Sequence, residues 1–397
     1  MRMFTNATTS GVPGSVETIR RDELACCRHW SHAFEHERKD YRYYEIVEDT
    51  ILQGFDYRYF AIRDLNGNVC AVQPFFILDQ DLLVGATPRV GSLIKAIRSI
   101  WPRFMRLRVL MVGCAAGEGH LDNADAMPPD CQSQLLASAI VPEASKLKVS
   151  LIVLKEFPAR YRSTLQCFLR HGFARVPSLP MTKLNIDYAS FADYMNKALN
   201  SATRTKLRRK FRAAAQAAPI EMRVVQDITP AVSEIYPLYL QVYERSQLHF
   251  EKLSKEYFCK LGRMMPDKVR FFVWRQNGRM VAFTLCMIDG DEIYAEYIGL
   301  DYSVALDLHL YHYAVRDLIT WSIANGYKWF RSSALNYDPK LHLRHRLDPV
   351  DLYVRHISRI KNPLLKLILP LIEPTRYDKT LNKFPNYKEL WCNQSTF

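Results

Sequence analysis

The chain has 397 residues, of which 48% are hydrophobic and 24% are charged, a composition typical of a globular protein with two domains. Its 54 Lys and Arg exceed its 41 Asp and Glu, and the formal net charge of +13 favours phosphates, nucleic acid or an anionic membrane as partners, although a solvated basic surface fits equally well. The nine cysteines lack metal-site spacing, and no apolar run approaches the ~18 residues that span a bilayer, so we expect no metal, no disulfide framework and no membrane span.

The first half of the chain is predicted to begin with a helix over Val16–His36 and to continue as a β-meander. Two apolar runs flank Asn66 and Gly67, a dipeptide that tolerates positive φ and is the strongest short signal for a hairpin. A second turn is predicted at Asp79–Asp81. A strand, a helix, a strand and a helix are then expected over residues 107–112, 131–148, 149–155 and 158–171.

A boundary between two domains is predicted near Ile186, after Pro177 and Pro180 and a strand over Thr182–Ile186. We expect an N-terminal domain over residues 1–186, a C-terminal domain over residues 187–350 and an extension over residues 351–397.

A polar helix predicted over Phe191–Ala218 carries a run of basic residues. Arg204, Arg208 and Arg212 share one face of this helix, and Lys206 and Lys210 share another. Such spacing suits the phosphates of tRNA, CoA or lipid head groups, and a charged surface helix with no ligand is the alternative.

The second half repeats the pattern of the first. A helical region over residues 228–261 precedes apolar runs that flank Asn277 and Gly278, and a turn at Gly290–Glu292 follows. A helix over residues 308–325 and a strand over residues 327–331 complete the unit. Each half is therefore predicted to be a mixed, mostly antiparallel sheet flanked by helices, an α/β (α+β) fold.

This tandem order of elements resembles the GCN5-related N-acyltransferases (GNAT), and the second half is similar to the acetyltransferase domain of CelD-like and Fem-like bacterial proteins. The resemblance rests on segments of both halves: Gly113–Asp122, Arg170–Val176, Lys268–Phe272, Asn277–Ala282, Asp291–Tyr294, Gly299–Asp301 and Trp321–Tyr327. It implies transfer of an acyl group from acyl-CoA, or a related thioester, to an amine on a small molecule or on a cell-wall or polysaccharide precursor.

Two departures from the family pattern leave other functions open. The turn Asp301–Asp307 has no glycine where an acyl-CoA loop has them, and no long helical arm of the Fem type is apparent. One alternative is a Fem-like transferase that takes its group from aminoacyl-tRNA and acts on a cell-wall precursor. Another is a non-catalytic protein that binds anionic ligands on a degenerate GNAT fold.

Acyl transfer needs a base for the amine and a proton donor for the leaving thiolate. Glu296 occupies the strand position from which the resemblance implies a general base, and simple alternation predicts that Tyr294, Glu296 and Ile298 share one face of the strand. His120 is a second candidate base. Tyr311 is the candidate acid, with core packing as its alternative role.

Glycines mark the first candidate site for the acyl donor. Gly113, Gly117 and Gly119 follow a predicted strand and would let the backbone approach a pyrophosphate or a thioester closely. Glu118 and Asp122 lie in the same loop, which is otherwise simply a tight turn with solvated side chains.

The second half offers its own candidates for donor binding. Ser303 and Asp307 lie in the turn that corresponds to the acyl-CoA loop, and Asp307 is the predicted N-cap of the next helix. Lys340 and Arg344 belong to a basic loop suited to phosphate or to solvent.

The tail from Ile357 to Phe384 mixes apolar and basic residues. Peripheral contact with a membrane and packing onto the second domain are both compatible with this pattern. Cysteines within apolar runs indicate a reducing compartment, so we expect a cytoplasmic protein, with contact at the inner membrane surface as an option.

Overall fold

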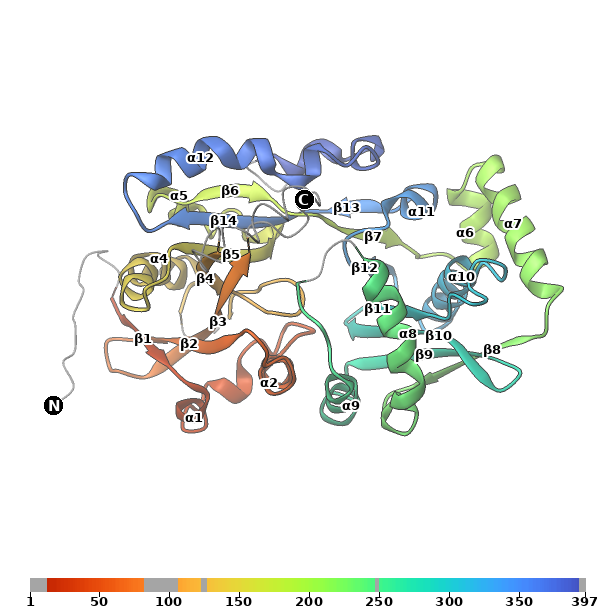
Figure 1. The fold of residues 1–397 in the computed structure, drawn as a ribbon, viewed down its shortest axis with the longest axis horizontal. Coiled ribbons are helices and arrows are strands. Elements are labelled where there is room, and N and C mark those ends of the chain that lie inside the picture. The colour runs from red at the N-terminus through yellow and green to blue at the C-terminus, as the bar shows by residue number, and fades with distance from the viewer. Residues whose placement is uncertain (1–12, 82–105, 123–126, 247–249, 393–397) are drawn as a thin grey trace, which may run out of the picture.

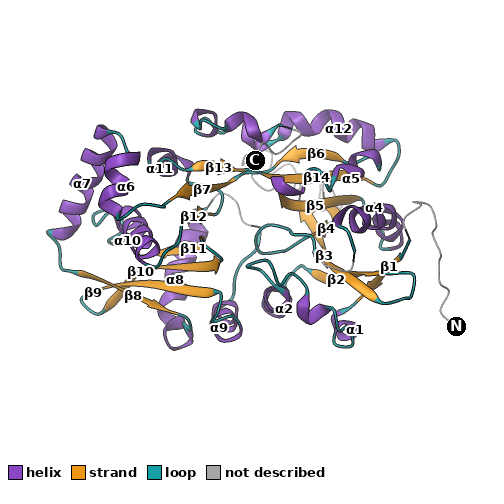
Figure 2. Cartoon of the chain, turned by 180° about the vertical axis from the view of Figure 1, so that it is seen from behind, coloured by secondary structure: helices purple, strands orange, loops and turns teal. Residues whose placement is uncertain are grey.

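The computed structural model describes residues 13–81, 106–122, 127–246 and 250–392, and these residues form two mixed sheets of seven strands each (Figure 1). Helices flank both sheets (Figure 2). The predicted fold class, two α/β units in tandem, is confirmed.

The first sheet is mostly antiparallel, with one parallel pair, β4 and β5, near its centre. Its strands in spatial order are β1 (Ser15–Ile19), β2 (Asp56–Arg63), β3 (Val69–Asp81), β4 (Arg106–Val112), β5 (Leu151–Pro158), β14 (Val350–His356) and β6 (Ala174–Pro177). Its helices are α1 (Arg21–Leu24), α2 (Tyr41–Thr50), α4 (Pro129–Lys146), α5 (Gln166–Arg170) and α12 (Lys361–Ile372).

The second sheet has the same plan, and its parallel pair is β11 and β12. Its strands in spatial order are β13 (Arg346–Asp348), β7 (Met181–Asn185), β12 (Trp329–Ser332), β11 (Glu292–Leu300), β10 (Arg279–Asp289), β9 (Val269–Gln276) and β8 (Ile220–Val225). Its helices are α6 (Phe191–Ala198), α7 (Ser201–Ala215), α8 (Val232–Arg245), α9 (Lys255–Met264), α10 (Leu310–Ala324) and α11 (Tyr337–His342).

The two predicted Asn-Gly hairpins are confirmed, because β2 pairs with β3 across Gly67 and β9 pairs with β10 across Gly278. Both glycines have positive φ, +84° and +77°, as these turns require. The repeat therefore builds a hairpin in each sheet, with a tight turn between Gln276 and Arg279 and a longer loop between Arg63 and Val69.

Three local predictions in the first half are wrong. Val16–His36 contains β1, whose residues alternate in exposure and pair with β2, rather than one long helix. Asp79–Asp81 is not a turn, because β3 continues through it and pairs with β4. Residues 158–171 form a 3₁₀ turn and the short α5 rather than one helix.

The two sheets exchange strands. β7 follows β6 in the chain but enters the second sheet between β12 and β13, and β14 follows β13 but enters the first sheet between β5 and β6. The sheets therefore do not separate at one point of the chain. A division into residues 1–186, 187–350 and 351–397 stays a prediction, with β7 and β14 crossing between the units it defines.

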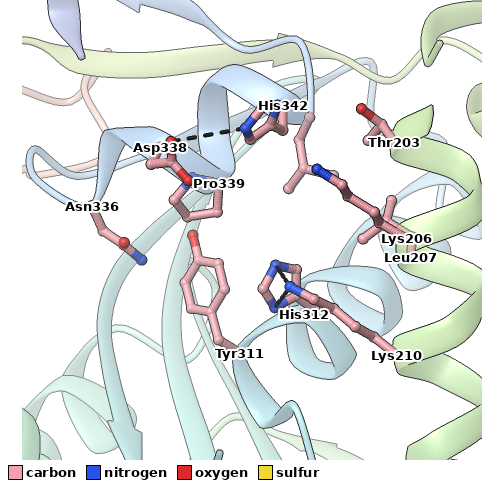
Figure 3. A pocket seen from close by; sticks show the side chains of 11 residues that line it. Thr203, Lys206, Leu207, Lys210, Tyr311, His312, Asn336, Asp338, Pro339 and His342 are labelled. Carbon is pink, nitrogen blue, oxygen red and sulfur yellow. Dashed lines mark hydrogen bonds and ion pairs between the residues drawn. The ribbon is translucent and has the colours of Figure 1, made fainter.

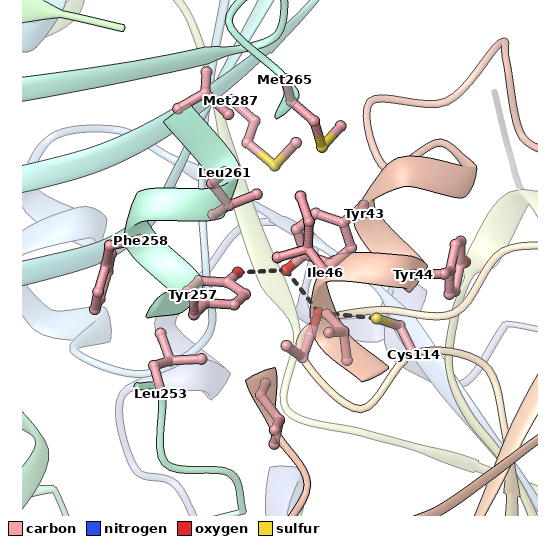
Figure 4. Close-up of a cluster of buried hydrophobic side chains, with 14 of the residues drawn as sticks. Tyr43, Tyr44, Ile46, Cys114, Leu253, Tyr257, Phe258, Leu261, Met265 and Met287 are labelled. Carbon is pink, nitrogen blue, oxygen red and sulfur yellow. Dashed lines mark hydrogen bonds between the residues drawn. The ribbon is translucent and has the colours of Figure 1, made fainter. Parts of the chain in front are cut away.

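A buried hydrophobic cluster is continuous across the two halves. It joins α2 to α9, where the hydroxyl groups of Tyr43 and Tyr257 lie 2.8 Å apart (Figure 4). Tyr43 also donates a hydrogen bond to the carbonyl of Ala116, 3.0 Å away. The halves thus share a packed interface as well as exchanged strands.

The exchange predicts that residues 1–186 will not fold alone. The fragment lacks β14, so β5 and β6 lose their common neighbour, and the buried Tyr353 and Val354 no longer fill the core. We expect little cooperative thermal unfolding by circular dichroism, and its recovery when residues 187–397 are co-expressed. A cooperative, native-like transition of the isolated fragment would contradict the exchange.

Candidate active site

A buried ionic network connects the two halves. Arg38 and Lys39 precede α2 and are 3% and 0% exposed. Lys39 Nζ lies 2.8 Å from Glu118 Oε2 and 3.4 Å from Glu296 Oε2. Arg38 pairs with Glu118, and its Nε donates to Glu296 Oε1 at 2.8 Å. Two cations thus lie between one carboxylate from each half, and their charges balance.

His120 extends this network within the first half. Its Nε2 lies 3.3 Å from Glu118 Oε1, and its Nδ1 lies 3.1 Å from Arg160 Nη2. Arg160 also donates to Glu37 at 2.5 Å. The two candidate bases predicted from sequence, His120 and Glu296, therefore belong to one chain of contacts through Glu118 and Arg38.

The cations determine the ionisation of the buried carboxylates. Burial alone would raise the pKa of Glu118, but Arg38, Lys39 and His120 outweigh it and hold this pKa well below 4.5. Burial likewise opposes ionisation of Glu37, and the neighbouring His120 and Arg160 lower its pKa. These carboxylates are charged acceptors that fix the cations.

The glycine-rich loop after β4 packs against β5. Lys155 Nζ donates to the Gly117 carbonyl at 2.7 Å, and Gly119 N donates to the Glu156 carbonyl at 3.2 Å. A Cβ atom at Gly117 would lie 2.0 Å from Lys39 Nζ, and one at Gly119 would lie 2.7 Å from the Lys155 carbonyl oxygen.

These contacts explain the glycines without a ligand. Gly113 also has a restricted position, since a Cβ there would lie 3.1 Å from the Gly119 Cα. The gap beyond β4 and β5 is thus filled by the protein's own groups. Donor binding by Gly113, Gly117 and Gly119 stays a prediction, and these contacts disfavour it.

Asp122 holds this loop in place. Its carboxylate accepts hydrogen bonds from Val72 N at 2.8 Å and Phe34 N at 3.2 Å, and it lies 2.6 Å from His29 Nε2. With three partners, it positions backbone rather than facing solvent.

Glu296 lies at a β-bulge in β11. Tyr297 pairs with Leu285 and Ala295 pairs with Cys286, which leaves Glu296 as the extra residue. The prediction that Tyr294, Glu296 and Ile298 share a face is therefore wrong. Tyr294 and Glu296 contact Arg38, whereas Ile298 packs into the core beside α10.

The bulge coincides with the point at which the parallel strands separate. β11 pairs with β12 only from Glu292 to Ala295, opposite Trp329 to Ser332. Among the residues that the structure describes, the rest of β11 has β10 as its only strand partner. Glu296 is the first residue after the separation.

A cavity of about 430 Å³ lies between α7, the start of α10 and α11 (Figure 3). Its lining residues are Thr203, Lys206, Leu207, Lys210, Tyr311, His312, Asn336, Asp338, Pro339, His342 and Leu343.

The cavity has a cationic wall. Lys206 and Lys210 project into it from α7, and Lys210 Nζ lies 2.9 Å from His312 Nε2 (Figure 3). Burial and the Lys210 charge lower the pKa of His312 to about 4, so a neutral imidazole accepts from the lysine at pH 7. The carboxylate in the lining, Asp338, lies 3.8 Å from His342. The arrangement favours an anionic ligand.

Of the three candidate catalytic residues, Tyr311 lines this cavity. Burial raises its pKa above the usual value of 10.0, so its hydroxyl stays protonated and can donate. The adjacent backbone is strained, since His309, Leu335 and Asn336 have positive φ of 50°, 72° and 49°. Such conformations in non-glycine residues concentrate at functional sites.

Ser303 and Asp307 lie outside the cavity lining. Ser303 Oγ donates to Asp301 Oδ1 at 2.6 Å within its own turn. Asp307 is exposed, and the prediction that it is the N-cap of α10 is wrong. The N-cap is His309, which makes no side-chain capping bond. The helix therefore begins without a side-chain acceptor.

The other predicted anion-binding residues also lie elsewhere. Arg204 donates to the Leu199 carbonyl at 2.6 Å, while Arg208 and Arg212 are exposed on the face of α7 away from the cavity. Lys340 is buried, with Nζ 2.5 Å from the Ser333 carbonyl, and burial lowers its pKa to about 7. Arg344 is exposed. The described residues contain no cluster of three or more His, Cys, Asp or Glu suited to a metal ion.

The paired sheets, each with a diverging parallel pair, form a tandem GNAT-like fold. A family model described as peptidoglycan biosynthesis/recognition, FemAB-like, matches residues 124–339, and the chain belongs to this family. The predicted relationship is therefore confirmed, and family and fold together support a transferase. No curated protein matches the chain.

Solved structures resemble the chain in fold. A conserved protein of unknown function from Bacteroides thetaiotaomicron has 11% identity and a TM-score of 0.50 over 86% of this chain and 99% of that one. FemX has 12% identity and a TM-score of 0.49 over 83% and 93%. A tandem GNAT protein from the clavulanic acid biosynthesis pathway has 10% identity and a TM-score of 0.43 over 87% and 99%.

The network predicts strong coupling between its members. Glu118→Gln leaves a buried cation without its partner, so we expect the free energy of unfolding to fall by about 3–5 kcal/mol in urea titrations. Adding Lys39→Met restores the charge balance, and the double variant should lose less than the sum of the single losses. The exposed Glu221→Gln is the control and should change stability by less than about 0.5 kcal/mol. Strictly additive losses would refute the coupling.

Proposed function

We propose that the chain is an acyltransferase that moves an acyl group from acyl-CoA, or a related thioester, to an amine, with the donor bound in the second half. The observation that carries this proposal is the cationic cavity at the start of α10, the helix that follows β11 in the chain. Ligands of α/β sheets bind outside the carboxyl ends of strands, where a break in pairing opens a crevice.

The cavity suits the phosphates of the donor. Lys206 and Lys210 supply two positive charges, and the start of α10 contributes its helix dipole without a capping side chain. The pantetheine arm would run between β11 and β12 toward Glu296. The glycine-free turn Asp301–Asp307 is then compatible with donor binding, because lysines and the helix end replace glycine-rich backbone.

The proposed transfer step uses one residue of the cavity and one of the buried ionic network. The amine nitrogen attacks the thioester carbonyl carbon, and the carbon–sulfur bond breaks. Glu296 accepts the proton lost by the amine, and the Tyr311 hydroxyl gives a proton to the departing thiolate. His120, which contacts Glu118, positions the network from the first half in this scheme.

The acceptor is proposed to be an amine on a cell-wall precursor, since the family is described by peptidoglycan biosynthesis and recognition. A small-molecule or polysaccharide amine fits the same chemistry. The proposed setting is the cytoplasm, with peripheral membrane contact through residues 351–397.

A second candidate donor is aminoacyl-tRNA. The exposed Arg208 and Arg212 lie on the same helix as the cavity lysines and enlarge the cationic surface beyond what CoA needs. Binding through these arginines would fall steeply with salt, because each neutralised phosphate releases counterions.

Calorimetric titration with CoA tests the donor site. Lys206→Ala and Lys210→Ala should each weaken CoA binding about tenfold, since each removes a charge-assisted contact to phosphate. Arg208→Ala and Arg212→Ala are matched controls on the same helix and should leave the Kd unchanged. Unchanged Kd values in both lysine variants would refute this site. A tRNA affinity that depends on the two arginines would instead favour the second donor.

Thiol release from acetyl-CoA in the presence of a panel of amines tests the chemistry. Tyr311→Phe should lower kcat about a hundredfold with KM for acetyl-CoA unchanged, because the proton donor is lost while donor binding is kept. Tyr313→Phe is the control, since Tyr313 packs on Arg316 at 3.9 Å and lies outside the cavity lining. CoA binding without turnover with any amine would indicate a non-catalytic protein.

A further inference from the structure

α12 packs against the first sheet through one face only. Leu369 is buried against Val109, Val153 and Val354 of that sheet, and Leu365 packs beside it. No other described part of the chain covers the opposite face of this helix, whose leucines are exposed.

Four apolar side chains form a row on that opposite face. Ile360, Leu364, Leu367 and Leu371 are 88%, 59%, 73% and 65% exposed. Their spacing of four, three and four residues places them in one line along the helix, opposite the buried Leu369. Soluble proteins rarely leave such a contiguous apolar row uncovered unless it binds something.

Cations surround the row. Residues 357–384 carry six basic side chains and two carboxylates. The basic residues are Arg359, Lys361, Lys366, Arg376, Lys379 and Lys383. The carboxylate of Glu373 is buried, with Thr375 and the Arg376 backbone as its partners, and that of Asp378 accepts from the Thr380 backbone. The surface around the row is thus cationic, and the adjacent Tyr377 is 66% exposed.

The helix is too short to cross a bilayer. Its 12 residues span roughly 18 Å at a rise of about 1.5 Å per residue. None of the described helices is long and apolar enough to pass through a membrane. An apolar row flanked by basic residues and an exposed tyrosine, on a helix of this length, is the pattern of an element that lies in the interfacial plane.

We propose that α12 docks the protein on the surface of a membrane that contains anionic lipids, with Ile360, Leu364, Leu367 and Leu371 inserted at the level of the head groups. Basic residues near the surface add roughly 1 kcal/mol each of attraction to an anionic leaflet. A two-fold dimer through the same row is less suitable, because symmetry would bring the basic residues of both copies together.

The inference does not depend on acyl transfer, since none of the residues that line the cavity belongs to α12. Figures 1 and 2 both show α12 along the same long edge of the molecule as β13 and α11. Docking through this edge would bring the protein to the surface that holds a membrane-associated acceptor, if the proposed function holds.

Vesicle flotation tests the docking directly. The full-length protein is mixed with vesicles of phosphatidylcholine alone or with 30 mol% phosphatidylglycerol, a composition of roughly the charge that attracts polybasic surfaces. We expect flotation with the anionic vesicles only. Leu364→Ser with Leu367→Ser should lower the partition coefficient about tenfold or more, and Lys361→Glu with Lys366→Glu should reduce it and its salt dependence.

Leu52→Ser with Leu65→Ser is the matched control, because both leucines are exposed elsewhere, at 66% and 80%. It should float like the unaltered chain. Equal flotation of the α12 variants and the unaltered chain would overturn the proposal. A second outcome would also overturn it: the unaltered chain does not float, and sedimentation equilibrium shows a dimer that dissociates in the Leu364→Ser, Leu367→Ser double variant.

Discussion

The ammonium group of Lys39 makes the contact on which the rest of the molecule depends. It lies against the Gly117 backbone and between Glu118 and Glu296, one carboxylate from each half. A charge this deeply buried is tolerated only when it is paired. The same contact therefore fills the space beyond the first parallel pair, joins the halves and fixes the carboxylate at the bulge of β11.

The Lys39 contact is one reason why the two sheets, although built on the same plan, differ in whether they leave a cavity. Each sheet has a parallel pair that separates, but in the first the separation is filled by a loop and by Lys155. In the second, α7, α10 and α11 leave a cavity with Lys206 and Lys210 on its wall. Exchange of β7 and β14 makes each sheet depend on the other half, so the filled unit supports the open one.

Local signals in the sequence predicted much of the fold, and long-range pairing limited the rest. The Asn-Gly turns depend on two adjacent residues and were predictable in both halves. The sheet that β7 and β14 each join depends on pairing with strands far away in the chain, and nothing within the two strands specifies it. Residues 37–40, Glu-Arg-Lys-Asp, are four consecutive charged residues without a local signal for burial, yet all four side chains are buried.

The candidate site was also only partly predictable, because it depends on packing between elements far apart in the chain. Tyr311 and the two basic faces of α7 could be predicted from helical spacing, but the face that lines the cavity depends on how α7 packs on α10 and α11. The bulge at Glu296 leaves no local signal, because its neighbours alternate as in a regular strand.

A crystal structure of the protein with bound CoA tests the division between a filled and an open unit most directly. The account predicts that the pyrophosphate lies beside Lys206 and Lys210 at the start of α10, with the thiol directed toward Glu296. Electron density for CoA on the Gly113–Gly119 loop, with Lys39 displaced from its carboxylates, would contradict it.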